Sequence, residues 1–119
     1  MTRRPTTTGL RIRLVFGPGA MLGPGKADLL DGIRETGSIA AAGRRMGMSY
    51  KRAWGLVEGM NATYRAPLVE TARGGASHGG ASLTGLGAEV LAAYRRLEAK
   101  ATAAAAAEIA ALSDMAERK

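Results

Sequence analysis

A cluster of hydrogen-bonding and cationic side chains precedes an apolar stripe at helical spacing. Within four residues it combines a hydroxyl, a phenol and two cations: Ser49, Tyr50, Lys51 and Arg52. At the start of a helix, such side chains lie beside backbone N–H groups that have no partner within the helix and suit phosphate. The planar fork of Arg52 can also donate twice to one guanine, whereas Lys51 suits phosphate or guanine equally. The cluster therefore indicates contact with nucleic acid.

Two helical patterns separated by a short turn must position this cluster. Ser38 can cap a first helix over 39–46, whose alanines and glycine would let another helix approach closely. Ser49 can cap a second helix that runs from Tyr50 to about Tyr64. Its inward-facing residues should be Ala53, Val57 and Met60, with Leu56 at the edge. The pair is typical of a helix-turn-helix, in which the first helix braces the second against the major groove of DNA.

The segment before this pair predicts a strand, a loop and a helix. Apolar and basic side chains alternate at the start of Leu10–Phe16, as in a strand with one buried face. The breaker-rich segment 17–25 predicts a loop, and a helix should begin near Lys26 and end at Gly37. The loop is not a phosphate-binding loop, because alanine stands at positions 20 and 27, where that motif needs glycine and serine or threonine.

A glycine-rich loop between two short strands, 68–72 and 81–83, predicts a β-hairpin. Such a hairpin is the natural wing beside a helix-turn-helix, and its loop could bring Arg73, Ser77 and His78 to phosphates or to the minor groove. By itself His78 indicates little, because a single histidine in a glycine loop is more often exposed and idle.

Positive charge is concentrated in the same region. The chain has 17 lysine and arginine residues against 10 acidic ones, which gives a formal charge of +7. Four of these seven net positive charges lie between Ser38 and Arg73. This balance favours a polyanionic partner, although many small proteins are basic for solubility alone. The candidate DNA-binding residues are Ser38, Arg44, Arg45, Ser49, Tyr50, Lys51, Arg52, Trp54, Arg73, Ser77 and His78.

Two of these assignments have open alternatives. Arg44 and Arg45 could be a solvated helix face. Trp54 lies off the inward stripe and could pack on DNA sugars or a thymine methyl group, or it could be buried under the wing or the N-terminal strand.

Thr84 can cap a long last helix whose larger apolar residues recur at helical spacing. About thirty residues at 1.5 Å each would form a rod of some 45 Å, so much of it should project from a small domain. A projecting apolar stripe predicts a partner, and we expect a homodimer. The candidate dimerisation residues are Leu86, Val90, Tyr94, Leu97, Ile109 and Leu112.

These elements predict a mainly α fold with a small β component. We expect a disordered tail over 1–8, a winged helix-turn-helix over 9–83 and a long dimerisation helix over 84–119. Because there is no cysteine and one loop histidine, we expect no catalytic residue, no metal site, no cofactor and no enzyme activity. No segment resembles a signal peptide or a membrane span, which predicts a cytoplasmic protein with no membrane partner.

The sequence resembles the ModE family of molybdate-responsive transcriptional regulators, whose N-terminal domain is similar to the LysR-type helix-turn-helix. The resemblance covers nearly all of residues 9–97. Its motifs are Gly23–Lys26, Thr36–Ile39, Met48–Trp54, Gly74–Gly75 and Gly79–Thr84. It implies a homodimer that is joined through the N-terminal strand region and the long helix, binds a palindromic operator in double-stranded DNA and usually represses molybdate-uptake genes.

Family members that sense molybdate carry a C-terminal pair of small oxyanion-binding β-barrels. The sequence has no such domain after its alanine-rich helix, so we do not expect this chain to sense molybdate. Our main prediction is a dimeric, sequence-specific transcriptional regulator. The alternative is an interaction or architectural protein that uses the long helix and binds DNA without sequence preference or not at all.

Overall fold

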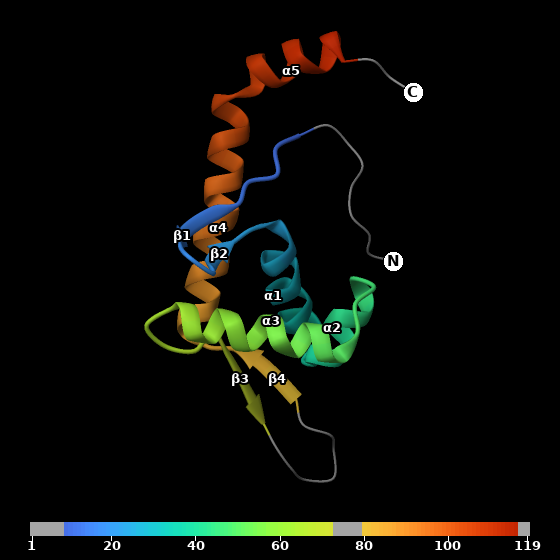
Figure 1. The fold of residues 1–119 in the computed structure, drawn as a ribbon, viewed down its shortest axis with the longest axis vertical. Helices are drawn as coiled ribbons and strands as arrows, with labels where there is room; N and C mark the ends of the chain where they lie inside the picture. The colour runs from blue at the N-terminus through green and yellow to red at the C-terminus, as the bar shows by residue number, and fades with distance from the viewer. Residues whose placement is uncertain (1–8, 73–79, 117–119) are drawn as a thin grey trace.

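The computed structural model describes residues 9–72 and 80–116. These residues form a mainly helical fold with two small antiparallel sheets (Figure 1). In chain order the elements are β1 (Leu14–Gly17), β2 (Ala20–Leu22), α1 (Pro24–Thr36), α2 (Ile39–Arg45), α3 (Tyr50–Thr63), β3 (Val69–Ala72), β4 (Gly80–Leu83), α4 (Gly85–Ala104) and α5 (Ala106–Met115). The predicted tail over 1–8 lies outside the described residues.

The first sheet pairs β1 with β2, with Leu14 opposite Leu22 and Gly17 opposite Ala20, and the register shifts between Val15 and Gly17. The predicted strand thus begins at Leu14 rather than Leu10, and the segment 17–25, which we expected to be entirely loop, contains β2. The reason is that the turn is confined to the residues around Gly19, whose φ of 74° suits glycine, so the chain can fold straight back and pair.

The second sheet pairs β3 with β4, in register from Val69 opposite Leu83 to Ala72 opposite Gly80. This antiparallel pair agrees with the predicted hairpin. It extends from the end of the molecule opposite α5 (Figure 1). Asn61 of α3 holds it in place, because its side-chain oxygen accepts hydrogen bonds from the backbone N–H groups of Leu68 and Val69 at 2.8 and 3.1 Å.

The core lies between α1, α3 and the base of α4. The predicted inward stripe of α3 is confirmed, since Ala53, Val57 and Met60 are at most 1% exposed and Leu56 is half-buried. The other large side chains that are fully buried come from α1, from the residue before β3 and from α4: Leu29, Leu30, Ile33, Leu68, Leu91 and Tyr94. Burial of this apolar surface is the main force that holds the helices together.

The C-terminal region differs from the single helix that the sequence predicts. Helix α4 ends at Ala104, and α5 continues from Ala106 in a different direction (Figure 1). The break lies at Ala105, within a run of alanines that has neither glycine nor proline. The hydrophobic period continues through this run unchanged, which is why the pattern carries no sign of a break.

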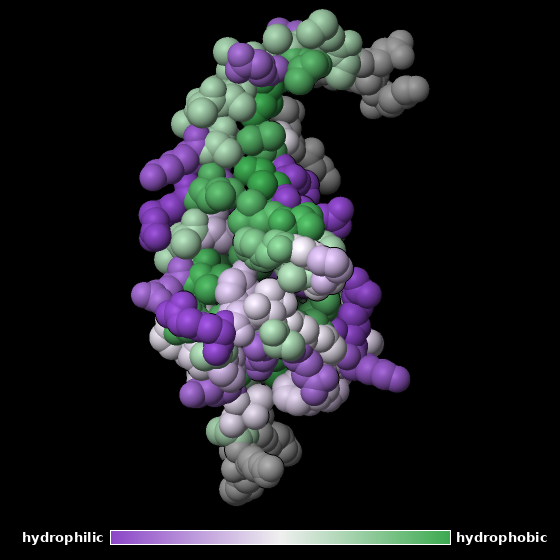
Figure 2. Space-filling view, turned by 60° about the vertical axis from the view of Figure 1, so that its left-hand side comes forward, coloured by the Kyte–Doolittle hydropathy of each residue, from purple (hydrophilic) through white to green (hydrophobic). Residues whose placement is uncertain are grey.

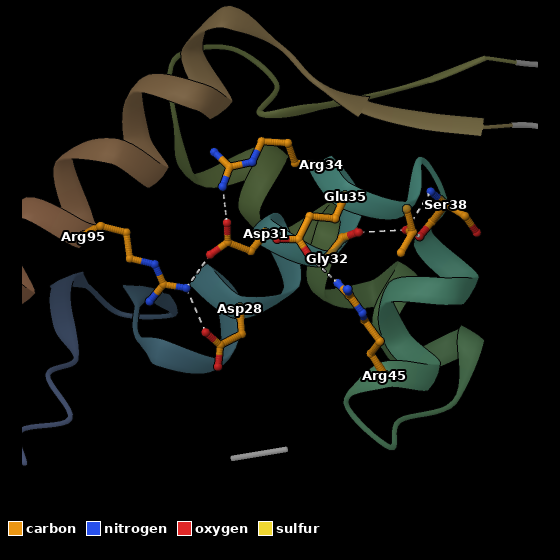
Figure 3. Close-up of polar contacts among 9 residues, drawn as sticks. Asp28, Asp31, Gly32, Arg34, Glu35, Ser38, Arg45 and Arg95 are labelled. Carbon is orange, nitrogen blue, oxygen red and sulfur yellow. Dashed lines mark hydrogen bonds and ion pairs between the residues drawn. The ribbon is translucent and has the colours of Figure 1, made fainter. Parts of the chain in front are cut away.

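Two adjacent residues of α4 attach it to the rest of the molecule. The Tyr94 hydroxyl donates a hydrogen bond to the backbone carbonyl of Ile12. The Arg95 guanidinium contacts Asp28 and Asp31 of α1 at 2.8 and 2.6 Å (Figure 3). It also pairs with Glu98 of its own helix. These contacts fix α1 and the N-terminal segment relative to α4.

The charge of Arg95 is stabilised by this network. Partial burial alone would lower the pKa of the guanidinium, but its hydrogen bonds to Asp28, Asp31 and Glu98 outweigh that effect and raise the pKa. Arg95 therefore stays charged, and Asp28 and Asp31 of α1 share an ion pair with this cation from α4.

Candidate nucleic-acid interface

The first turn of α3 is open to solvent. Ser49 caps the helix, because its hydroxyl accepts a hydrogen bond from the backbone N–H of Arg52 at 3.1 Å. All four residues of the predicted cluster, Ser49, Tyr50, Lys51 and Arg52, are exposed. Neither Lys51 nor Arg52 forms an ion pair with another described residue. The turn therefore presents cations, a phenol and the N-terminal end of the helix dipole together.

The turn before α3 depends on one glycine and one close contact. Gly47 has a φ of 72°, which side-chain-bearing residues rarely adopt, and the N–H of Met48 donates to the carbonyl of Gly43 at 3.0 Å. A Cβ atom on Gly43 would lie 2.9 Å from Cβ of Ala53. Glycine thus lets α2 brace α3 at short range, and the core-facing side of α3 is fixed while its first turn stays exposed.

Trp54 is intermediate between its two predicted roles. It is half-buried and packs against the core cluster, which agrees with a structural role. Its indole also stacks on the ring of Tyr50, with the centroids 6.4 Å apart and an angle of 11° between the planes. Because Tyr50 is 58% exposed, the two rings form a supported aromatic face beside Lys51.

The three predicted residues of α2 are placed differently from one another. Ser38 caps the helix by accepting a hydrogen bond from the N–H of Ala41 and is half-buried, so its hydroxyl already has a structural partner. Arg44 is exposed and has no ion pair with a described residue. Arg45 pairs with Glu35 of α1 at 2.8 Å (Figure 3). This ion pair differs from both predicted roles, because the guanidinium is neither free in solvent nor free to bind phosphate.

The predicted contacts in the wing loop, Arg73, Ser77 and His78, lie outside the described residues. The strands that lead into this loop are described as far as Ala72 and from Gly80.

Sequence reasoning missed a group of cations next to α3. Arg11 and Arg13 of the N-terminal segment and Lys26 of α1 line an open groove together with Arg44 and Arg52. A signal was present in the alternation of Arg11 and Arg13 with apolar residues, but that alternation predicts a strand and says nothing of what the strand faces. The return of the chain through β2 and α1 is what brings these residues beside α3.

The predicted dimerisation residues divide into two sets. Leu86 and Val90 are half-buried and pack against the core, and Tyr94 is 2% exposed, so these side chains are engaged within the chain. For Tyr94 this differs from our expectation: it lies inside the core because it reaches toward Ile12. The remaining residues are further out. Leu97 and Ile109 are half-buried, and Leu112 is 65% exposed.

Hydrophobic surface gathers on the side of the molecule that carries α4 and β1 (Figure 2). Large apolar residues that remain exposed include Val15 and Phe16 of β1 and Leu112 and Met115 of α5. Phe16 is partly supported by an edge-to-face contact with Tyr64. Exposed apolar surface of this kind is typical of an interaction site.

No helix within the described ranges has both the length and the apolar character that a membrane crossing requires.

Comparison with known proteins gives relatives of two kinds. The chain is 48% identical over 81 residues to the molybdenum-pterin-binding protein MopB of Rhodobacter capsulatus, a match that covers 68% of this chain and 30% of MopB. It is 36% identical over 104 residues to MopA of the same organism, covering 87% of this chain and 38% of MopA. It is also 39% identical over 71 residues to the DNA-binding transcriptional dual regulator ModE of Escherichia coli K12, covering 60% of this chain and 27% of ModE.

No protein-family model matches the chain. The names of these relatives are those of binding and regulatory proteins rather than enzymes. The chain spans about a third of the length of the relatives it matches. It is thus related, over part of their length, to proteins named for molybdenum-pterin binding and for transcriptional regulation.

Proposed function

We propose that this chain is a dimeric, sequence-specific DNA-binding regulator of transcription of the ModE type. In this proposal α2, the turn at 46–49 and α3 act as a helix-turn-helix, and the hairpin of β3 and β4 acts as its wing. Residues 9–83 then form the DNA-binding unit, and the region from residue 84 onward carries dimerisation. The sequence-reading residues are Lys51 and Arg52, with Arg44 on the adjacent phosphates.

The observation that carries this proposal is the exposed first turn of α3. Its residues are exposed, while the opposite side of the helix is buried through Ala53, Val57 and Met60. A helix held in this way can enter a major groove about 12 Å wide without unfolding its own support. Arg52 can donate two hydrogen bonds to one guanine there.

The relatives support the same reading. The match to MopB is 81 residues long in a chain of 119, so wherever it begins it includes both α2 and α3. The shared sequence therefore includes the elements to which we assign DNA binding, and one relative that shares part of this chain is named as a DNA-binding regulator. Because the relatives carry molybdenum in their names, we place the regulated genes in molybdenum metabolism.

Dimerisation is assigned to the exposed apolar side chains of α5 and the half-buried ones at the outer part of α4. A two-fold dimer would place two copies of α3 about 34 Å apart, in successive major grooves on one side of the duplex. A palindromic operator follows from that symmetry.

Selection of bound duplexes from a random pool tests the proposal. A dimeric regulator should yield a palindromic sequence that it binds at least about a thousandfold more tightly than random duplex at the same salt concentration. Equal binding of both duplexes, or no binding, would overturn the proposal in favour of an architectural or interaction protein that uses its C-terminal helices.

A second candidate function is binding of a molybdenum-pterin ligand. The two Rhodobacter capsulatus relatives favour it, since their names state that activity and their matches cover 68% and 87% of this chain. Equilibrium dialysis of the chain against molybdate, and separately against a molybdenum-pterin complex, distinguishes the two functions. Retention of either ligand without selective duplex binding would support this candidate, whereas selective duplex binding without retention would support the regulator.

A further inference from the structure

The groove beside α3, which we name the N-terminal groove, is lined by charged residues from three parts of the chain. Arg11 and Arg13 come from the N-terminal segment, Lys26 from the first turn of α1, and Arg44 and Arg52 from the two sides of the turn between α2 and α3. The groove is open and has a volume of about 1300 Å³. It is large enough for an extended ligand and too open to enclose a small one.

Each acidic residue that lines this groove is ion-paired with an arginine. Asp28 and Asp31 are paired with Arg95, which reaches them from α4, and Glu35 is paired with Arg45 (Figure 3). Among the described residues, Arg11, Arg13, Arg44 and Arg52 have no ion pair. The wall of the groove therefore keeps a net positive charge that points to an anionic ligand.

The two N-terminal arginines are held in a defined position. They alternate with Ile12 and Leu14, which are half-buried, so both arginines lie on the exposed side of the segment. The backbone at Ile12 is tied to α4 by the Tyr94 hydroxyl, and the next residues enter β1. Side chains on a fixed segment lose less freedom on binding than those on a free tail.

The position of the groove indicates which anion it meets. It includes Ser49 and Arg52, so it adjoins the first turn of α3, the end of the helix that we propose reads the bases. When a helix enters a major groove, the two phosphate backbones lie on either side of it, so cations beside the helix face phosphates rather than base edges. Arginine also matches phosphate through two parallel hydrogen bonds.

We propose that Arg11 and Arg13 bind the phosphate backbone of the duplex beside α3, and that the N-terminal groove is a second DNA contact that fixes the register of the helix. This assignment rests on the proposed function and extends it to a segment outside the helix-turn-helix and the wing. Phosphate contacts carry no base information, so these two arginines set affinity and salt dependence but not sequence preference.

The test compares the full-length chain with the double variant Arg11→Ala/Arg13→Ala on the selected duplex and on random duplex across a salt series. Each phosphate contact that is lost should reduce the slope of log affinity against log salt by about 0.9. Both duplexes should be bound more weakly by the same factor, so their ratio should stay at the wild-type value. A variant Arg11→Lys/Arg13→Lys keeps both charges and should retain most of the slope.

The matched control is Arg65→Ala, which removes an exposed arginine that does not line the groove and should leave the slope unchanged. A wild-type slope and affinity for Arg11→Ala/Arg13→Ala would overturn the inference while leaving the regulator intact. A changed ratio between the two duplexes would also overturn it, since the arginines would then read bases. If the wild-type chain bound no duplex but retained an acidic peptide such as polyglutamate through these arginines, the proposed function would fail as well.

Discussion

Gly43 of α2 and Ala53 of α3 lie so close that a Cβ atom on the glycine would be 2.9 Å from the Cβ atom of the alanine. Real Cβ atoms do not approach so closely, and neither atom belongs to a flexible side-chain end. The contact therefore fixes the separation of the two helices at a distance that only glycine permits. Ala53 lies next to the exposed residues Lys51 and Arg52. Gly43 therefore sets the position of the candidate interface although it is not part of that interface.

Replacing Gly43 with alanine should separate α2 from α3. The added methyl group overpacks a rigid contact, which typically costs about 1 to 3 kcal/mol, although the gain in helix propensity offsets part of it. The free energy of unfolding, measured with urea, should fall accordingly. The matched control is Gly55→Ala in α3, where a Cβ atom meets nothing within 4 Å. That variant should be as stable as the wild type or more so, and equal stability of the two variants would contradict the close-packing argument.

Gly87 in the first turn of α4 offers a second and stricter test. A Cβ atom there would lie 2.1 Å from the carbonyl oxygen of Leu68, which is backbone and cannot rotate away. Gly87→Ala should therefore destabilise the fold by roughly 3 kcal/mol, at the upper end of overpacking costs, because the helix must shift from the hairpin. Gly85→Ala, two residues earlier in the same turn, has open space around it and should be nearly neutral. Thermal unfolding of both variants by circular dichroism provides the measurement.

The Tyr94 hydroxyl predicts a dependence of stability on alkaline pH. Burial, assisted by Glu98, raises the pKa of Tyr94 above the value near 10 that it has in the unfolded chain. The folded state therefore holds the proton more tightly, so the stabilisation is fully present below about pH 10 and is lost as pH rises through the raised pKa. Tyr94→Phe should cost about 0.5 to 1.5 kcal/mol at pH 7 and should lose less stability than the wild type above pH 10.

Tyr64 provides the control for that experiment, since burial also raises the pKa of its hydroxyl. Tyr64→Phe should keep the part of the alkaline loss that Tyr94 causes. Urea titrations at several pH values from 7 to 11.5 separate the two contributions. An alkaline loss in Tyr94→Phe as large as in the wild type would show that titration of the Tyr94 hydroxyl is not its source.

Much of the fold was predictable because its signals are local. The stripe of Ala53, Val57 and Met60, the caps Ser38 and Ser49, and the end of α1 at Gly37 each follow from neighbours in the sequence. The start of β1 and the presence of β2 were missed because pairing across a two-residue turn is decided by the geometry of the hairpin rather than by composition. The break at Ala105 was missed because alanine strongly favours helix, so the alanine run carries no local signal of a break.

The candidate site shows the same division. Exposure of Lys51 and Arg52 follows from their place opposite the inward stripe, so the sequence predicts it. The pairing of Arg45 with Glu35, and the entry of Arg11 and Arg13 into the groove, depend on contacts between separate elements. Sequence distance hides such contacts. Tyr94 is the clearest case, because its hydrogen-bond partner Ile12 lies 82 residues earlier in the sequence.

The outer C-terminal apolar residues should control the oligomeric state. Leu112→Asp places a charge on a side chain that is 65% exposed and makes little contact within the chain, so folding of the remainder should be unaffected. If α5 carries dimerisation, the weight-average mass from sedimentation equilibrium should shift toward that of one chain. The control Glu108→Gln alters an exposed residue of the same helix without removing apolar surface. If the Leu112→Asp variant remained fully dimeric, the dimer interface would have to lie at β1 or at the inner part of α4 instead.

Arg52 should determine preference at one base pair of the selected duplex. It is exposed in the first turn of α3, its backbone N–H is held by the Ser49 cap, and its side chain has no ion pair with a described residue. Arg52→Ala should weaken binding of the selected duplex by about 1 to 3 kcal/mol and relax the preference at one position, whereas binding of random duplex should change far less. Arg52→Lys keeps the charge but loses the bidentate fork, so it should restore binding of random duplex without restoring the preference. Competition titrations with duplexes substituted at each position measure both effects, and an unchanged preference in Arg52→Ala would assign base reading to Lys51 or to the face formed by Tyr50 and Trp54.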